Sequence, residues 1–206
     1  MQYFAWGINK PDVKDQRTAI IKTHWDFIAQ YSDQLIVRGP VMRPDDFSVV
    51  TGSIHIADLP DQAALNRFVY DEPFASAGLF EEIIVARFEL ELGRTQFEFT
   101  STPDSPRFFV YCPAQVGTTS KRDTLKPAHE TYCQKFDEHF VSRGSLLSDE
   151  GEWLGSLFFL EMPDRTAVDA FLKDEPYSQA DLFSDVQIHR WTMGGPENLN
   201  AAGALS

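Results

Sequence analysis

The sequence predicts an α+β protein of two tandem ferredoxin-like modules, each with the element order βαββαβ, packed sheet against sheet within one chain. Two observations predict this fold class. A shift of 105 residues places much of the first half on the second, including His24 on His129. After one turn of different length, a shift of 103 residues places the tripeptide Asp-Glu-Pro at 71–73 on 174–176. This ordered series of identities indicates an internal repeat, and both copies show the same alternation of strand and helix patterns.

Each module begins with a strand and an amphipathic helix. Residues 2–8 and 107–112 are rich in the aromatic and β-branched types that favour strands. In the next segment of each half, large apolar side chains and one histidine recur at steps of four, three and four residues, which is the spacing of one helical face. These residues are Ile20, His24, Phe27 and Tyr31 in the first half, and Leu125, His129, Tyr132 and Phe136 in the second.

A hairpin, a second helix and a last strand follow. The hairpin strands are expected at 34–40 with 49–57, and at 140–147 with 153–161. A Pro-Asp pair then opens a helix in each half, because proline is tolerated in the first turn and an acidic residue favours the N-terminus. That helix ends before Asp-Glu-Pro, since proline disfavours helical angles in the residue before it. The last strands are expected at 82–92 and 185–193.

The packing of the two modules follows from the exposed face of each sheet. Both helices of a βαββαβ module cover the same face, and an uncovered apolar face would aggregate. We therefore expect the two sheets to pack together as an internal pseudo-dimer. The expected divisions are a module at 1–92, a linker at 93–106, a second module at 107–193 and a flexible tail at 194–206.

Composition narrows the classes of partner. The 18 Lys and Arg against 31 Asp and Glu give a formal charge of −13, which repels nucleic acid and anionic lipid. No apolar run reaches the roughly 18 residues of a spanning helix. Cys112 and Cys133 lack the spacing of a disulfide framework or metal site, and no Walker or dinucleotide-binding glycine pattern is present. We expect a cytoplasmic protein with a small-molecule ligand, no nucleic-acid or membrane partner, no metal and no cofactor.

The duplicated histidines are the main candidates for chemistry. His24 and His129 lie within apolar helical stripes, so their burial requires a hydrogen bond or a pocket. Beside a carboxylate, an imidazole can act as a general base near neutral pH. The alternative is a structural histidine satisfied by the backbone. The other three histidines have no counterpart in the repeat and are expected at the surface or as filler; they are His55, His139 and His189.

Two further residue types lie near these histidines on the helices. Arg17 and Arg122 precede them by seven residues, on the same face, where a guanidinium can bind a substrate carboxylate or phosphate. A surface salt bridge is the favoured alternative for both. Cys133 follows His129 by four residues, a spacing that suggests a nucleophilic cysteine activated by the histidine. Ile28 occupies the equivalent position in the first half, however, and this favours a small core residue.

The order of these motifs resembles the YCII-related (YciI-like) family. The matching segments are Lys126 to His129, Asp174 to Phe183 and Ile188 to Trp191 in the second half, and Tyr3 to Trp6, His24 and Asp71 to Phe80 in the first. The resemblance implies modules that pair into a dimeric α/β barrel, here within a tandem chain, with a histidine and a carboxylate at the barrel cleft. It leaves open whether two chains pair further.

The carboxylate partner is ambiguous in this sequence. The family usually has Asp before the proline, whereas Glu72 and Glu175 stand there and Asp71 and Asp174 lie one residue earlier. A helix end with solvated acids is a structural alternative for the tripeptide.

Two hypotheses for function follow. The first is a cofactor-independent lyase, isomerase or hydrolase with His129 as base and Asp174 or Glu175 as its partner. His24 with Asp71 or Glu72 then forms a second site. The alternative is a non-catalytic small-ligand-binding or assembly module.

Overall fold

The computed structural model describes residues 1–196, so most of the tail expected at 194–206 lies outside the described residues. The first half contains β1 (Gln2–Asn9), α1 (Lys14–Ala29), η1 (Ser32–Gln34), β2 (Leu35–Met42), β3 (Val50–Asp58), α2 (Gln62–Tyr70), α3 (Pro73–Ser76) and β4 (Phe80–Leu90). The second half contains β5 (Arg107–Pro113), α4 (Thr119–Cys133), η3 (Gln134–Phe136), β6 (Phe140–Leu147), β7 (Trp153–Glu161), α5 (Arg165–Asp174), α6 (Pro176–Gln179) and β8 (Gln187–Trp191). Both halves show the expected order, with one extra short helix, α3 or α6, that begins at the proline of the tripeptide.

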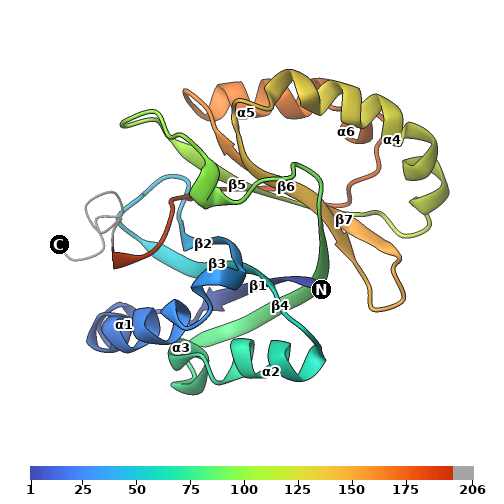
Figure 1. Cartoon of the computed structure of the whole chain (residues 1–206). Helices are drawn as coiled ribbons and strands as arrows, with labels where there is room; N and C mark the ends of the chain where they lie inside the picture. The colour runs from blue at the N-terminus through green and yellow to red at the C-terminus, as the bar shows by residue number, and fades with distance from the viewer. Residues whose placement is uncertain (197–206) are drawn as a thin grey trace.

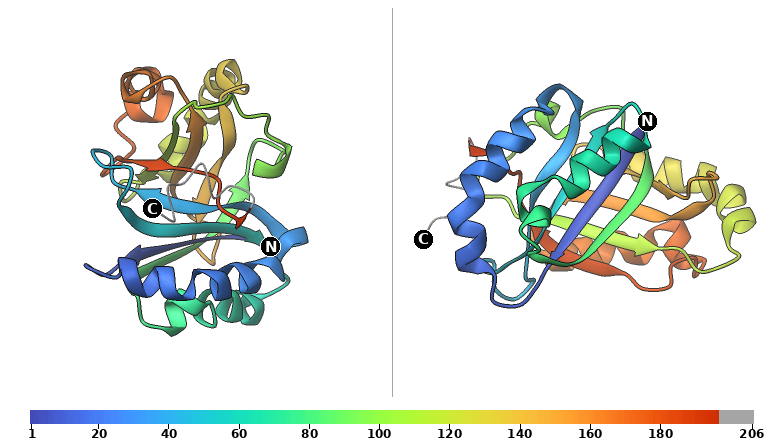
Figure 2. Two further views of the ribbon diagram at one scale, coloured as in Figure 1. Left: turned by 90° about the vertical axis from the view of Figure 1, so that its left-hand side faces the viewer. Right: turned by 90° about the horizontal axis from the view of Figure 1, so that it is seen from below.

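The eight strands close into one antiparallel barrel, in the order β1-β3-β2-β8-β5-β7-β6-β4. Two equivalent seams join the halves. At one seam β4 pairs with β6, and at the other β2 pairs with β8. The helices of the first half cover one side of the molecule and those of the second half cover the opposite side, with the strands between them (Figures 1 and 2). The predicted fold class, a tandem pair of α+β modules forming an α/β barrel, is confirmed.

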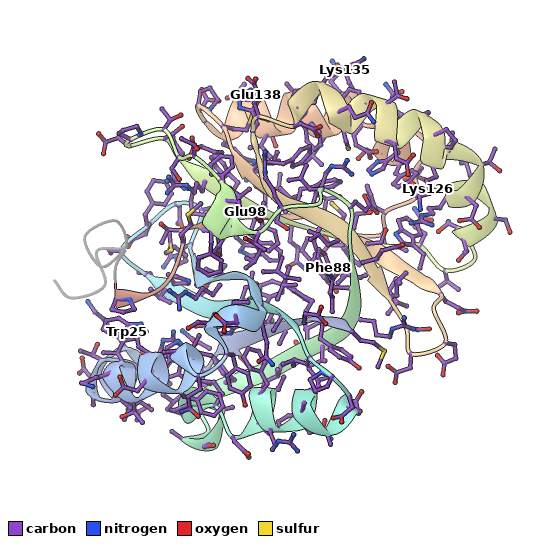
Figure 3. All side chains as sticks on the ribbon, viewed as in Figure 1. Trp25, Phe88, Glu98, Lys126, Lys135 and Glu138 are labelled. Atoms are coloured by element: carbon purple, nitrogen blue, oxygen red, sulfur yellow. The ribbon has the colours of Figure 1, made fainter. Side chains whose placement is uncertain are left out.

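Side chains from both halves fill the barrel. Alternate residues of each strand point inward, and the buried cluster there includes Phe4, Trp6, Phe109, Phe159 and Trp191. Phe88 of β4 belongs to the same cluster and lies between the two halves in Figure 3. Separate clusters hold the helices of each half against the outer faces of the strands. The shared interior explains why neither sheet is left with an exposed apolar face.

The segment between the two modules packs against both of them. It contains the 3-10 turn η2 (Gln96–Glu98), and the buried Gln96 accepts a hydrogen bond from the Arg38 backbone N–H at 2.7 Å. Thr102 N–H donates to Glu161 Oε1 at 2.8 Å. The connection therefore contributes polar contacts at the rim of the barrel.

The helices give no sign of a transmembrane segment. Within residues 1–196, none combines the length and apolarity needed to cross a bilayer.

Candidate functional site

The histidine of each first helix contacts the glutamate of Asp-Glu-Pro. The Nδ1 atom of His24 lies 2.5 Å from Glu72 Oε1, and that of His129 lies 2.7 Å from Glu175 Oε1. Both glutamates are buried, whereas the aspartates before them, Asp71 and Asp174, are exposed. The structure therefore brings each histidine together with Glu and places the two Asp side chains away from it.

The tripeptide holds the glutamate in place through the short helix that it starts. Proline fits the first turn of α3, and the Glu72 carboxylate caps the helix by accepting from Phe74 N–H at 3.0 Å and Ala75 N–H at 2.9 Å. Glu175 caps α6 in the same way. The glutamate of the tripeptide thus caps a helix and contacts the imidazole, and the solvated acid expected at the helix break is found only in the aspartate.

The protonation of the first pair follows from its surroundings. Burial lowers the pKa of His24, and its hydrogen bond to Glu72 does not offset this effect. Burial acts to raise the pKa of Glu72, but hydrogen bonds from His24, Phe74 and Ala75 lower it overall. At neutral pH the pair is an imidazole beside a carboxylate. Nδ1–H of His24 donates to Glu72, so Nε2 carries the lone pair.

A cavity of about 200 Å³ lies beside His24 and is built from both halves of the chain. Its wall includes the imidazole, Trp25 of α1, and Met193 and Gly194 from the segment after β8. Trp25 marks the position of this face of α1 in Figure 3. The second half therefore completes the cavity. Its strand β8 pairs with the end of β2 and leads directly into Met193 and Gly194.

Arg17 gives the cavity a fixed positive charge. Its guanidinium donates to Asn9 Oδ1 and to Ser53 Oγ, each at 2.8 Å, and lies 3.9 Å from the centre of the Phe74 ring. Burial lowers the pKa of Arg17 to about 10, which still leaves it protonated at neutral pH. Arg17 lines the cavity together with Arg38 and Lys14.

The expectation of a surface salt bridge is wrong for Arg17, whereas Arg122 does pair with an exposed carboxylate although its own side chain is buried. Arg17 and Arg122 are both buried. Arg122 donates to Ser145 Oγ at 2.9 Å and also pairs with the exposed Asp123 at 3.2 Å. In each half the guanidinium extends under the helix to a serine of the barrel, which amphipathic spacing alone does not reveal.

His55 was expected at the surface or as filler and instead lies in the site. It is buried, lines the cavity, and its ring centre lies 5.7 Å from that of His24. Burial and the neighbouring His24 lower the pKa of His55 to about 3, so the ring is neutral. The repeat concealed this residue because its counterpart is Phe158.

The second histidine has a different environment. His129 Nε2 lies 3.7 Å from Glu91 Oε2, so carboxylates lie on both sides of this ring. Burial acts to lower the pKa of His129, but interactions with Cys133, Glu175 and Glu91 raise it overall. The ring is an imidazolium at neutral pH. Cys133 is fully buried in the core of the second half, in agreement with a small core residue.

Glu91 was not identified as a site residue from the sequence. It follows β4 and therefore enters the second half from the first, where it accepts from Arg143 Nη1 at 2.9 Å and Ser145 Oγ at 2.7 Å. Burial acts to raise the pKa of Glu91, but contacts with His129, Ser145 and Arg143 lower it overall. The residue at the equivalent position of the repeat is Gly194, so the carboxylate has no duplicate that could mark it.

Neither histidine belongs to a group of described side chains arranged to hold a metal ion. The part of the chain that the structure describes contains no group of three or more His, Cys, Asp or Glu side chains placed to hold a metal ion.

Comparisons with known proteins address family and fold. A sequence model of the YCII-related domain matches residues 1–89 and again residues 107–192. No curated protein matches the chain. A variant of chlorite dismutase from Candidatus Nitrospira defluvii superposes with a TM-score of 0.63 and 10% identity, over 98% of this chain and 95% of that chain. A putative monooxygenase from Lactobacillus acidophilus NCFM has a TM-score of 0.56 and 8% identity, over 93% and 92%.

A third solved structure matches one half of the chain. It is the 5-chloro-2-hydroxyhydroquinone dehydrochlorinase of Burkholderia phenoliruptrix AC1100, 24% identical, with 44% of this chain and 96% of that chain covered and a TM-score of 0.41. The two longer superpositions show the barrel fold.

Proposed function

This chain belongs to the YCII-related domain family, and we propose that it is a small-molecule enzyme of the lyase, isomerase or hydrolase type with His24 as general base. One observation carries the proposal. His24 is a neutral imidazole whose Nδ1 is fixed by Glu72 at 2.5 Å and whose ring lines a cavity of about 200 Å³. A buried base beside a cavity and held by a carboxylate is the arrangement that proton transfer requires.

The proposed step uses side chains of this chain. Nε2 of His24 takes a proton from a C–H or O–H group of the substrate, or from a water that attacks it. The electron pair of the broken bond stays on the substrate or on the attacking oxygen. Glu72 stabilises the resulting imidazolium, while the positive charge of Arg17 stabilises negative charge that develops in the cavity. Return of the proton to another atom gives isomerisation, and loss of a leaving group gives elimination. When the deprotonated water attacks, the bond to the leaving group breaks and that group takes the proton from Nε2, which gives hydrolysis.

This assignment places the base in the first half, whereas the sequence favoured His129. The His129 ring is protonated and has a carboxylate beside each nitrogen, so it lacks the lone pair that a base needs. We propose that the second half mainly supports the barrel. The protonated His129 ring between two carboxylates favours the alternative function, a non-catalytic role, for the second half.

Hydrogen exchange tests the proposal for substrates that lose a carbon-bound proton, because it detects removal of that proton whatever step comes next. A panel of small carbon acids, including lactones, keto acids and hydroxylated ring compounds, is incubated with the protein in D2O and followed by NMR. We expect exchange in at least one compound, reduced by about 10²-fold or more in His24→Gln. His139→Gln is the matched control, because His139 contacts the Glu161 carbonyl and does not line the cavity. Exchange that survives in His24→Gln, or that is lost only in His129→Gln, would contradict the assignment.

A further inference from the structure

His55 of β3 is a buried histidine, with 8% of the residue exposed. Within residues 1–196 neither ring nitrogen of His55 makes a hydrogen bond. The ring instead contacts the rings of His24 and Phe68, whose centres each lie 5.7 Å from its own. A buried polar group without a hydrogen bond costs free energy. The imidazole therefore has hydrogen-bonding capacity that the described part of the chain does not use.

The second module shows what a residue with a packing role alone looks like at this position. Phe158 is the counterpart of His55, and its ring packs against Phe140 and Phe171 in the apolar cluster of that half. It also lies beside His129, with ring centres 6.2 Å apart. An apolar ring therefore satisfies the fold at this place, and packing does not explain the imidazole of the first module.

Strand β3 places His55 in the cavity wall together with Ser53. Side chains two residues apart on a strand point to the same face. Ser53 accepts a hydrogen bond from the Arg17 guanidinium at 2.8 Å, and all three residues line the cavity beside His24. The wall thus combines an imidazole with a fixed positive charge. Both favour a ligand oxygen that becomes negative during a reaction.

The two imidazoles of the cavity differ in what they can do. Glu72 fixes Nδ1 of His24 at 2.5 Å and the Phe74 ring stacks on it at 4.2 Å, so Nε2 of His24 presents a lone pair. Burial and the neighbouring His24 lower the pKa of His55 to about 3, so this ring stays neutral when His24 takes up a proton. A neutral imidazole keeps one N–H group that it can donate. Because a hydrogen bond spans about 3 Å, neighbouring atoms of one small ligand can contact both rings.

We propose that the cavity takes a carbonyl compound with an acidic hydrogen on the adjacent carbon, and that His55 is a second catalytic residue, which donates its N–H to the carbonyl oxygen. The proposal names the substrate class of the proposed function and rests on it for the reaction. The contact between His55 and a ligand oxygen can be tested separately.

The proposed step accounts for every electron pair. Nε2 of His24 removes the proton, the electron pair of the C–H bond forms the C=C bond of an enolate, and the π pair of the carbonyl moves to its oxygen. His55 keeps its own proton, and its hydrogen bond strengthens as the oxygen becomes negative. Return of the proton to a different carbon gives isomerisation. Departure of a leaving group from the next carbon, with its bonding pair, gives elimination.

His55→Phe tests the proposed role, because phenylalanine stands at this place in the second module. With a keto acid that exchanges in D2O, we expect the rate at saturation to fall by about 10²-fold, while the half-saturating concentration changes less than about twofold. His55→Gln retains a side-chain N–H and should lose about tenfold or less. His139→Phe is the matched control, because His139 is exposed and does not line the cavity, and it should exchange like the wild type.

Two binding probes separate hydrogen-bond donation from shape. Pentafluorophenol is an acidic phenol that carries a negative oxygen at neutral pH, whereas pentafluorotoluene has a similar size and no oxygen. Fluorine NMR titrations measure both dissociation constants. We expect His55→Phe to weaken binding of pentafluorophenolate by about tenfold or more, and to change binding of pentafluorotoluene by less than about twofold. A residue that only shapes the cavity would affect both probes equally.

Urea denaturation gives a third readout. The midpoint for His55→Phe should equal or exceed that of the wild type, because the substitution removes a polar group without a partner and adds apolar contact with Phe68. A histidine needed for packing would give a lower midpoint. Dispersed amide spectra establish that each variant is folded.

Three results would overturn the proposal: exchange at the wild-type rate in His55→Phe, equal weakening of both probes, or a lower urea midpoint in His55→Phe. Failure of the proposed function is distinguishable from these. If exchange is lost in His24→Gln but unaffected in His55→Phe, the base assignment stands and only the role of His55 is wrong. If no compound exchanges, the proposed function fails, while the two probes still decide whether His55 binds a ligand oxygen.

Discussion

Glu91 of the first half lies against His129 of the second, with Oε2 3.7 Å from Nε2, and both side chains are largely withdrawn from solvent. Arg143 also pairs with Glu91, so one carboxylate from the residue after β4 meets two cations of the other module. A buried charge is tolerated only when it is paired. The seam between the modules therefore depends on a charged cluster as well as on the apolar interior of the barrel.

Removing the Glu91 charge should destabilise the protein. Glu91→Gln leaves the cations of His129 and Arg143 without one of their partners, and breaking a buried pair typically costs about 3 kcal/mol of unfolding free energy. Urea denaturation measures the change. Glu89→Gln is the matched control, because Glu89 lies two residues earlier, is exposed on β4 and should change stability by less than about 0.5 kcal/mol. Equal losses in the two variants would show that the cluster contributes nothing specific.

The cost of Glu91→Gln should depend on pH. The pKa of His129 is raised in the folded state, so its contribution is complete below its unfolded value of 6.5 and is lost as pH rises through the folded pKa. The pKa of Glu91 is lowered, so its contribution is present above its unfolded value of 4.5 and is lost as pH falls through the folded pKa. The stability difference between wild type and Glu91→Gln should therefore be largest between pH 4.5 and 6.5 and shrink toward alkaline pH. Urea titrations at about pH 5.5 and about pH 9 measure it, and a difference that grows at the alkaline pH would reverse the assigned charges.

The repeat explains which parts of this structure the sequence could predict. Residues that occur twice, such as His24 and His129, could be identified because duplication separates them from chance. The barrel followed from the same logic, since two equal modules with one bare sheet face each must cover one another. Glu72 could not be chosen over Asp71 because the selection depends on the capped turn of α3, which a tripeptide pattern does not specify.

The residues that distinguish the two sites could not be predicted, because they are not duplicated. His55 and Glu91 each occur in only one copy, opposite Phe158 and Gly194. Asymmetry between the copies carries the difference between the two histidine environments, but a search for shared residues does not detect it. Contact across the seam between β4 and β6 is also a tertiary feature, and no local periodicity indicates it.

Glu72→Gln should show whether the glutamate or the neighbouring aspartate is the partner of His24. The amide can still accept from a backbone N–H, but it provides no negative charge for an imidazolium at His24. We expect the hydrogen-exchange rate to fall by about 10²-fold and the unfolding free energy by about 1–3 kcal/mol. Asp71→Asn is the control, because Asp71 is exposed, and both properties should stay near wild type. A larger loss of exchange in Asp71→Asn would make the aspartate the partner.

Chemical modification should distinguish the two histidines in a single sample. Diethyl pyrocarbonate acylates the lone pair of a neutral imidazole, so reactivity reports both protonation state and access. The lowered pKa of His24 and its place in the cavity wall predict modification at neutral pH. The raised pKa of His129, with Glu91 beside its second nitrogen and only 2% of the residue exposed, predicts protection. Peptide mass spectrometry measures both sites together. Glu91→Gln should increase the reactivity of His129, because one of the carboxylates that keep the ring protonated is gone. Preferential labelling of His129 in the wild type would place the neutral imidazole in the second module and reverse the functional assignment of the two halves.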